Sequence, residues 1–360
     1  MFYSPVFYSK LQQLLYPKVK LYPLVLTWYV TLKCNLFCIF CFQQKNYFSA
    51  DSSQELFTKE AFKFIDDLAC LYRFYPVKPL IIISGGEPLL REDIFFLCSY
   101  IEEKGLRYRF ASSMSLDNSF KITKLARLKP QALGVSIDPD AETYAANRNK
   151  KELFNLVVKN IDRYRLLNKT VPIKLCCTIT DKNIGTLYKL PALAKRWGAS
   201  LNVCHLQFLT LAEKKRHYQR VLDVFGTGIR PSSGHVNYFE TLTIKAMAAD
   251  IKKTKKEAKK LKTSLKFIPE ISEKELESYY CGTDFFSCGL RCRSYFYELR
   301  IAPDGEIYPC LQYSYGNIKK FSFRDILAGE AACRFRTIIR KNDIFPGCFR
   351  CAKKIIYRKY

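Results

Sequence analysis

The chain has 360 residues, 48% of them hydrophobic and 26% charged, so it can bury a sizeable core and is not a disordered protein. Lys and Arg (59) outnumber Asp and Glu (33), and the net charge of +26 favours an anionic partner such as nucleic acid, a membrane surface or a phosphorylated substrate. Fifteen cysteines without a signal peptide argue against a secreted disulfide framework. They favour a reducing cytoplasm, where clustered cysteines usually bind metal. The longest apolar run near the start, residues 21–32, is too short to span a membrane.

Short β-branched runs alternate with segments of helical period through the first 210 residues. The pattern predicts strands at 24–31, 80–84, 106–111, 132–138, 173–180 and 201–208, with helices at 59–72, 91–104, 119–128, 151–167 and 184–197. Such alternation predicts an α/β fold in which helices cover a parallel sheet. Six strands are too few to close an eight-stranded barrel, so a partial (β/α)6 TIM-like barrel and an open doubly wound sheet both fit.

Three cysteines follow the first predicted strand directly, as Cys34, Cys38 and Cys41 in a CxxxCxxC spacing. Three small apolar side chains on one face of a buried helix would give the same spacing. Chemically, three thiolates can hold three irons of a [4Fe–4S] cluster and leave the fourth iron open, whereas electron-transfer clusters use four cysteines. An open iron can bind a small chelating molecule.

A glycine pair ends the second predicted strand, in the sequence Ser84-Gly85-Gly86-Glu87-Pro88. The glycines allow a ligand to approach the backbone closely. Glu87 offers an acceptor for an ammonium group, and Pro88 suits the first turn of a following helix. This turn falls at the carboxyl end of its strand, next to the cysteine loop. The pair of motifs resembles the radical S-adenosylmethionine (radical SAM) enzymes.

The resemblance implies a [4Fe–4S] cluster on Cys34, Cys38 and Cys41 that binds S-adenosylmethionine (SAM) through its open iron. It also implies that Gly85, Gly86 and Glu87 hold the methionine amino group, and that Phe40 lies near the adenine. Softer matches to cofactor-binding positions of the family are Ser136, Arg148 and Asn183. One departure is Ser112-Ser113-Met114-Ser115, where the family more often has Thr-Asn-Gly, and it leaves the local substrate and adenine contacts open.

A second cysteine set follows near the C-terminus, made of Cys292, Cys310, Cys348 and Cys351. Residues 299–302 and 306–309 flank Pro303-Asp304-Gly305 and read as a β-hairpin, which brings Cys310 back towards Cys292. The closing CxxC completes four thiolates, which bind either a [4Fe–4S] cluster or structural Zn²⁺. Cysteine count alone does not separate the two.

The segments 302–310, 316–318 and 323–326 resemble the auxiliary-cluster domains called SPASM and twitch. With no further cysteine after the CxxC, the arrangement is closer to the twitch type, which implies one auxiliary [4Fe–4S] cluster. Cys281 and Cys288, just upstream, are candidates for a replacement ligand or a redox thiol. The expected organisation is an N-terminal extension (1–20), a radical SAM core (21–210), a helical, Lys-rich connecting region (211–280) and a small cysteine-rich α+β auxiliary-cluster domain (281–360).

Nine lysines lie between residues 245 and 266, on a segment whose apolar residues recur at helical spacing. This predicts a basic amphipathic helix, which is either a solvated face or a docking surface for an anionic lipid, nucleic acid or acidic peptide. The histidines, His205, His217 and His235, are isolated and are expected to be structural.

The sequence thus predicts a cytoplasmic radical SAM oxidoreductase or maturase with two [4Fe–4S] clusters. As the resemblance implies, it would reductively cleave SAM to a 5′-deoxyadenosyl radical and abstract hydrogen from its substrate, which is then oxidised or cross-linked with help of the auxiliary cluster. A reducing partner such as flavodoxin or ferredoxin is expected. Peptide or protein modification is favoured over dehydrogenation of a sugar-like, cyclitol-like or phosphorylated small molecule. RNA modification and a non-catalytic zinc or iron–sulfur electron-transfer protein also fit the sequence, less closely.

Overall fold

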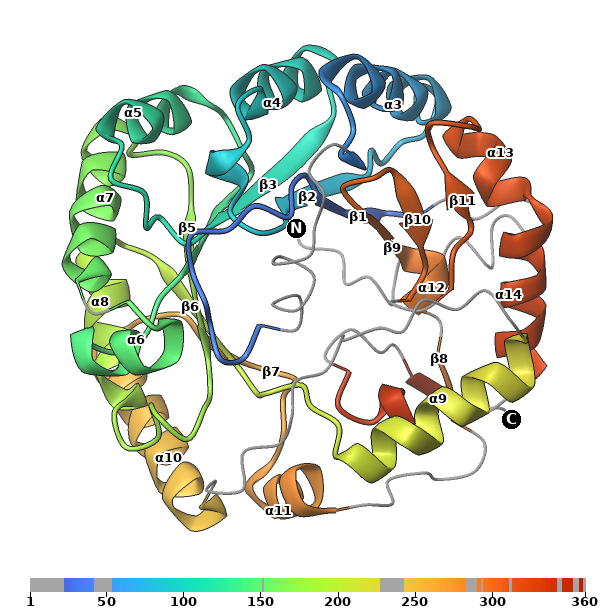
Figure 1. The fold of residues 1–360 in the computed structure, drawn as a ribbon. Coiled ribbons are helices and arrows are strands. Elements are labelled where there is room, and N and C mark those ends of the chain that lie inside the picture. The colour runs from blue at the N-terminus through green and yellow to red at the C-terminus, as the bar shows by residue number, and fades with distance from the viewer. Residues whose placement is uncertain are drawn as a thin grey trace.

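A parallel sheet surrounded by helices forms the body of the molecule (Figure 1). The computed structural model describes residues 23–41, 54–150, 152–226, 243–282, 290–292, 294–310, 313–341, 345–351 and 356–358. Within them lies a ten-stranded sheet of order β11-β10-β9-β1-β2-β3-β4-β5-β6-β7. Every pairing from β9 to β7 is parallel, and only β10 and β11 run antiparallel to their neighbours.

All six strands predicted for the barrel are confirmed. They are β1 (Val25–Tyr29), β2 (Leu80–Ser84), β3 (Arg107–Ser112), β4 (Leu133–Ser136), β5 (Ile173–Thr178) and β6 (Ser200–Cys204). The predicted helices are confirmed as α3 (Thr58–Leu71), α4 (Ile94–Glu103), α5 (Ser119–Arg127), α7 (Leu153–Leu167) and α8 (Leu190–Arg196), the last preceded by the 3₁₀ turn η3 (Leu187–Lys189). The first helical turn expected at Pro88 is the 3₁₀ turn η2 (Pro88–Leu90), and the sequence analysis missed the short helix α6 (Ala141–Arg148).

The core lies between the sheet and the outer helices, because alternate strand residues point to opposite faces. On β2, Ile81 and Ile83 are fully buried, whereas Leu80, Ile82 and Ser84 on the inner face are half-buried. The same alternation runs through β3, β5 and β6. Apolar stripes on the helices cover the outer face; Phe64 of α3, for example, packs edge-on against Trp28 of β1 with ring centroids 5.4 Å apart. The inner face is less apolar, since it carries polar side chains such as Arg109 of β3 and Lys174 of β5 beside Leu80 and Ile82 of β2.

The connecting region contains a strand that the sequence analysis did not predict. Helices α9 (Leu211–Phe225), α10 (Ile244–Lys260) and α11 (Glu273–Cys281) are present, but β7 (Leu265–Ile268) pairs parallel with β6. The basic helix was expected to reach Lys266 and instead ends at Lys260, and Lys262 adopts a left-handed φ of 53°. The barrel sheet therefore extends beyond residue 210, and residues 211–280 are not wholly helical.

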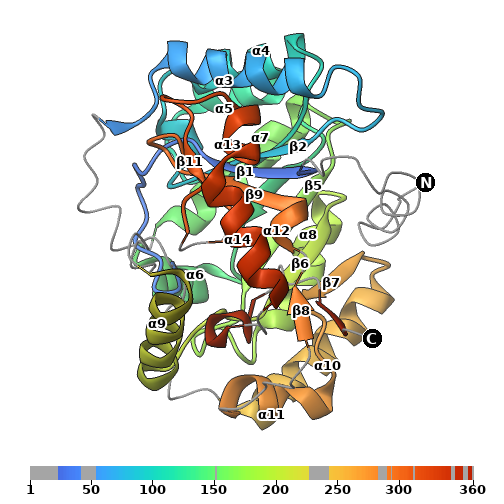
Figure 2. The same ribbon diagram turned by 90° about the vertical axis from the view of Figure 1, so that its right-hand side faces the viewer.

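The C-terminal hairpin was predicted correctly, but it is also part of the barrel sheet. Strands β9 (Glu298–Ile301) and β10 (Glu306–Tyr308) are antiparallel, and Gly305 takes the positive φ (+87°) of the turn. Strand β9 pairs parallel with β1, so the hairpin that leads to Cys310 shares a sheet with the strand that precedes Cys34. Around the hairpin lie β11 (Gly316–Asn317), α12 (Ser294–Tyr297), α13 (Phe323–Ala328) and α14 (Glu330–Lys341) (Figure 2). Strands β8 (Leu290–Cys292) and β12 (Ile356–Arg358) form a separate antiparallel pair, and Cys348 ends the 3₁₀ turn η4 (Pro346–Cys348).

A fully buried arginine fixes the CxxC turn of the second cysteine set. Arg350, inside that turn, donates to both carboxylate oxygens of Glu213 on α9 at 2.9 and 3.0 Å. Its other nitrogens donate to the carbonyls of Tyr279 (2.7 Å) and Gly282 (3.0 Å) at the end of α11. The guanidinium also lies 4.0 Å from the ring centroid of Phe208. One cation thus joins the CxxC turn to two helices and to the end of the barrel.

Replacing Arg350 by Met is expected to lower the free energy of unfolding by about 3–5 kcal/mol, because the Glu213 carboxylate would stay buried without its partner. Equilibrium urea unfolding would measure the change. The Glu213→Gln/Arg350→Met double variant should recover part of the loss, since it removes the uncompensated charge. A loss no larger than that of an exposed control, Arg196→Met, would contradict this role for the ion pair.

Candidate active site

The first cysteine loop leaves the carboxyl end of β1 and is held by two charged residues at its start. The carboxylate of Glu55 accepts from the Thr31 hydroxyl at 2.8 Å and from the Leu32 amide at 2.9 Å. Arg91 donates to the Val30 carbonyl at 2.8 Å and forms an ion pair with Asp93. The backbone just before Cys34 therefore has a fixed path.

The glycine pair after β2 packs directly against this loop. The Gly86 amide donates to the Thr31 carbonyl, and the Glu87 amide to the Lys33 carbonyl, both at 2.8 Å. A Cβ atom on Gly86 would lie 2.1 Å from the Lys33 carbonyl oxygen, and one on Gly85, whose φ is +136°, would lie 2.5 Å from that of Thr31. Only glycine permits this approach. The glycine pair thus positions the cysteine loop, in addition to any contact that it makes with a ligand.

The Glu87 side chain is buried and is already hydrogen-bonded within the protein. One oxygen accepts from the Leu89 amide (3.1 Å) and the Ser112 hydroxyl (2.8 Å), and the other from the amide (2.8 Å) and hydroxyl (2.5 Å) of Ser113. Burial raises the pKa of this carboxyl, although the hydrogen bonds from Ser113, Leu89 and Ser112 oppose the effect. An ammonium group at Glu87 would compete with these four donors, so its role in holding the methionine amino group stays a prediction.

The serine-rich departure after β3 has a structural consequence. Ser112 and Ser113 supply donors to Glu87, and the Ser115 hydroxyl lies 2.7 Å from that of Ser113. Met114 has a φ of 55°, which is uncommon for a residue other than glycine. The Asn160 side chain of α7 donates to the Met114 carbonyl at 2.8 Å and so stabilises this conformation. The segment is therefore an ordered polar support for the Gly85–Glu87 turn.

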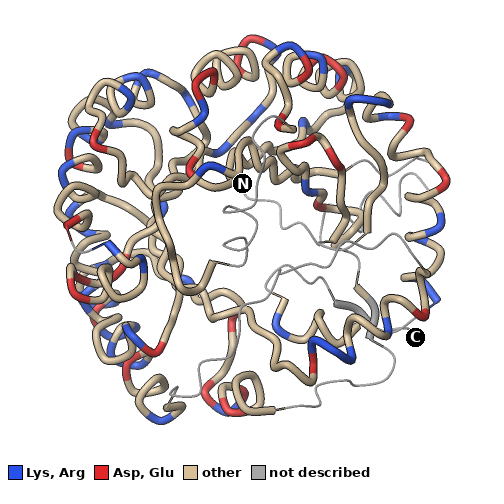
Figure 3. The backbone as a smooth tube through the Cα atoms, in the orientation of Figure 1, with Lys and Arg blue, Asp and Glu red and all other residues tan. Residues whose placement is uncertain are grey.

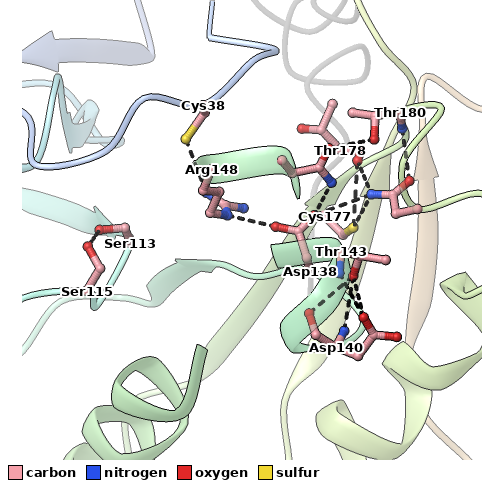
Figure 4. Close-up of polar contacts among 12 residues, drawn as sticks. Cys38, Ser113, Ser115, Asp138, Asp140, Thr143, Arg148, Cys177, Thr178 and Thr180 are labelled. Carbon is pink, nitrogen blue, oxygen red and sulfur yellow. Dashed lines mark hydrogen bonds and ion pairs between the residues drawn. The ribbon is translucent and has the colours of Figure 1, made fainter. Parts of the chain in front are cut away.

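Arg148 lies beside the cysteine loop, as Figure 4 shows. Helix α6 begins after Asp140, whose carboxylate accepts from the Thr143 amide at 2.9 Å, and it ends at Arg148. From there Arg148 Nη1 lies 3.7 Å from the Cys38 sulfur, and Nε donates to the buried Asp138 carboxylate at 2.7 Å. Burial disfavours the charged guanidinium, but attraction to Asp138 prevails and raises the pKa of Arg148. A fixed positive charge thus stands next to a candidate iron ligand.

A network of buried side chains holds Asp138 and ties α6 to the end of β5. The side-chain nitrogen of Asn147 donates to the Asp138 carboxylate at 2.6 Å. The side-chain oxygen of Asn147 accepts from the Thr180 hydroxyl at 2.7 Å. The side-chain nitrogen of Asn183 donates to Asp138 (3.3 Å) and to the Thr178 backbone carbonyl (2.8 Å). The side-chain oxygen of Asn183 accepts from the backbone amide of Thr180. Asn183 therefore acts as a link between strand ends, and a contact of this residue with SAM stays a prediction.

The first cysteine set suits an iron–sulfur cluster in its donor chemistry. Cys34, Cys38 and Cys41 are partly exposed, and none of them forms a disulfide. Burial raises the pKa of Cys34 to about 12, and it also raises that of Cys38, although Arg148 opposes it there. The thiols of Cys34 and Cys38 are therefore protonated near neutral pH until a metal displaces the proton. Among the described residues, no three cysteine, histidine or carboxylate groups come together as a site for a single metal ion.

The four cysteines of the second set come from separate segments: β8, the end of the β9–β10 hairpin, η4 and the turn that follows it. Cys348 is within electrostatic range of Cys310, Cys292 and Cys351. Cys310 in turn interacts electrostatically with Arg300 and with the thiols of Cys292 and Cys351. The fold thus brings all four predicted ligands into one region, as the predicted hairpin implied.

The remaining predicted residues are more dispersed. Phe40 lies on the cysteine loop with its ring centroid 5.4 Å from the Arg148 guanidinium carbon, and Ser136 is half-buried at the end of β4. Cys281 is exposed at the end of α11, while Cys288 lies outside the described residues. His205 is buried, and burial lowers its pKa to about 4 with a further contribution from Lys255, in keeping with a structural role.

The basic helix α10 packs on the outside of the barrel (Figure 3). Its buried Asp250 accepts from the amides of Gly185 and Leu187, so the acidic residue is turned inwards. The lysines of residues 245–266 all lie exposed to solvent. Sequence reasoning missed three charged residues, Asp138, Glu55 and Arg350. Asp138 follows Ser136 closely and Arg350 lies inside the CxxC, so their place in a motif could have singled them out, whereas Glu55 is remote in sequence from both motifs.

Replacing Gly86 by Ala should displace the cysteine loop, because the new methyl group would overlap the backbone of Lys33. We expect the anaerobically reconstituted variant to lose the iron assigned to the first cysteine set and to keep the rest. Iron analysis would measure this, with Gly134→Ala as control, since a Cβ there meets no atom closer than 3.7 Å. Equal iron content in Gly86→Ala and Gly134→Ala would contradict the proposal that the close approach of Gly86 to Lys33 shapes the cysteine loop.

Comparison with known proteins agrees with this geometry. Family models of the radical SAM superfamily and of SPASM, an iron-sulfur cluster-binding domain, match residues 28–184 and 292–352, respectively. The AdoMet-dependent heme synthase of Methanosarcina barkeri is 34% identical over 178 residues, which are 49% of this chain and 48% of the relative. The mycofactocin maturase MftC of Mycolicibacterium smegmatis is 29% identical over 191 residues, 51% of this chain and 45% of the relative. The chain thus spans about half the length of these relatives.

The fold has a solved counterpart of low sequence identity. The structure of Streptococcus suis SuiB bound to precursor peptide SuiA superimposes with a TM-score of 0.58 at 15% identity, covering 91% of this chain and 69% of that one. Among the described residues, no helix combines the length and the apolar character needed to cross a bilayer. The two matched domains imply iron–sulfur clusters and SAM as cofactors. The chain belongs to the radical SAM superfamily and carries a C-terminal SPASM domain.

Proposed function

We propose that the protein is a radical SAM oxidoreductase that modifies a peptide or protein. It would hold one [4Fe–4S] cluster on Cys34, Cys38 and Cys41 and a second cluster on the four cysteines of the C-terminal set. The observation that carries the proposal is the close approach of the Gly85–Glu87 turn to the cysteine loop at the carboxyl ends of adjacent parallel strands. Ligands of α/β barrels bind at this end of the sheet.

The residues of the chain would position and shield the reacting groups. When bound, the first cluster and SAM supply a 5′-deoxyadenosyl radical that removes hydrogen from the substrate. Arg148 places a positive charge beside Cys38 and is itself oriented by Asp138, so it can attract an anionic group of the cofactor. The buried network around Asp138 excludes water from this side of the site and keeps Arg148 from turning away.

Support for a peptide substrate comes from the maturase relative and from the fold neighbour solved with its precursor peptide. The auxiliary cluster would accept the electron that the substrate radical gives up, and a flavodoxin or ferredoxin would supply the electron for SAM cleavage. The hairpin that carries Cys310 pairs through β9 with the strand that precedes Cys34, so one sheet joins the first cysteine loop to one member of the second set. This connection favours an auxiliary cluster that works together with the first.

A second candidate substrate is a carboxylate-bearing tetrapyrrole, favoured by the heme synthase relative and by the charge of the inner sheet face. Arg109 of β3 and Lys174 of β5 occupy inward positions in the strand alternation. Burial and mutual repulsion lower the pKa of Lys174, and burial lowers that of Arg109. Two basic side chains on the same inner face form a lining that an anionic substrate would neutralise.

Iron analysis tests the two-cluster proposal. Anaerobically reconstituted protein should hold about eight irons per chain, and the Cys34/Cys38/Cys41→Ala triple variant about four, since one cluster site is removed. The matched control is Cys98→Ala, which removes a buried core thiol and should leave the iron content unchanged. About four irons together with zinc in the wild type would make the second set structural, and no iron at all would exclude the enzyme proposal.

Binding of an iron porphyrin would separate the two substrates. A peptide-modifying protein should give the same weak change in porphyrin absorbance for the wild type and for Arg109→Gln/Lys174→Gln. A tetrapyrrole enzyme should bind the porphyrin tightly, and the double variant should lose roughly tenfold or more in affinity, about 1.4 kcal/mol, as two charge-assisted contacts are removed. Tight binding that depends on both cations would overturn the peptide proposal.

A further inference from the structure

The inner faces of β1 and β9 bring together polar side chains at the junction of the two domains. The register pairs Val25 with Glu298 and Thr27 with Arg300, so these side chains share one face. The Thr27 hydroxyl donates to the Glu298 carboxylate at 3.0 Å. Tyr29 follows Thr27 on the same face, so it is a diagonal neighbour of Arg300 across the two strands, and the two side chains interact electrostatically.

This group lies between the two cysteine sets. Tyr29 is within electrostatic range of Cys41, at the end of the first loop. On the other side, Arg300 is paired with Tyr308 of β10, and Cys310 follows two residues later. Arg300 is within electrostatic range of both Cys310 and Cys351. The four thiols would bear an anionic cluster, so a half-buried cation would stand at its edge.

A charge in this position has a definite effect on an iron–sulfur cluster. Adding an electron makes the cluster more negative, and a nearby positive charge stabilises that state by Coulomb attraction. Net charge and hydrogen bonds around the sulfurs are among the factors that set the reduction potential of such clusters. Glu298, on the same face, acts in the opposite sense, since its carboxylate repels the added electron.

We propose that Arg300 raises the reduction potential of the auxiliary cluster and so enables it to take an electron from the substrate radical, with Tyr29 as a positioning residue for the guanidinium. The inference rests on the proposed function, which assigns a cluster to the second set. In that step the substrate radical loses one electron and one proton. The electron reduces the oxidised auxiliary cluster, and the proton passes to solvent.

The test isolates the auxiliary cluster in the Cys34/Cys38/Cys41→Ala background and measures its midpoint potential by a redox titration followed by electron paramagnetic resonance. Arg300→Gln should shift the potential downwards, and Glu298→Gln should shift it upwards. Arg300→Lys, which keeps the charge, should lie between Arg300→Gln and the unsubstituted background. Arg109→Gln is the matched control, because that arginine also faces inwards but interacts with Tyr297, Arg107 and Lys174 rather than with cysteines.

The outcomes separate this inference from the proposed function. Background protein without iron would overturn the proposed function and this inference with it. Iron present with no downward shift in Arg300→Gln, or with the same shift as in Arg109→Gln, would overturn the inference alone. Should Arg300→Gln fail to fold, the Glu298→Gln shift decides, because an unchanged or lower potential there contradicts the electrostatic effect proposed for this face.

Discussion

The contact between Gly86 and the carbonyl of Lys33 is the constraint on which the candidate site depends. It lets two neighbouring strand ends approach until the cysteine loop is hydrogen-bonded to the turn after β2. Any side chain at Gly86 would meet backbone atoms, which cannot move aside without displacing Cys34. The glycine pair, first singled out as a ligand-binding turn, is therefore also what shapes the loop that carries the candidate iron ligands.

Strand β1 connects this site to the C-terminal domain. Its carboxyl end leads into the first cysteine loop, and its edge pairs with β9, whose hairpin carries Cys310. The CxxC turn is held from another direction, by Arg350 against Glu213 on α9. The second cysteine set thus depends on contacts with strand β1 and with helix α9, which explains how candidate ligands from separate segments converge.

Local sequence patterns were sufficient for the six barrel strands and for the hairpin, because period-2 alternation and the Pro303-Asp304-Gly305 turn are short-range signals. They were insufficient for β7, which is four residues long and follows a lysine-rich helix. Pairing of β9 with β1 joins residues far apart in the sequence, and no local pattern reports it. The cysteine spacing indicated the candidate ligands, whereas the contacts of Asp138 and Arg350, and the position of Arg300 beside Thr27, arise only in the tertiary structure. Met114, in a left-handed conformation, likewise depends on Asn160 from another helix.

The most direct test of the central claim is reductive cleavage of SAM. Reconstituted protein supplied with SAM and a low-potential reductant should form 5′-deoxyadenosine, and Cys38→Ala should abolish the product while keeping the auxiliary iron. Product formation that survives loss of Cys38, or its absence from wild-type protein whose first cluster is shown to be intact, would contradict the assignment of this loop as the catalytic centre.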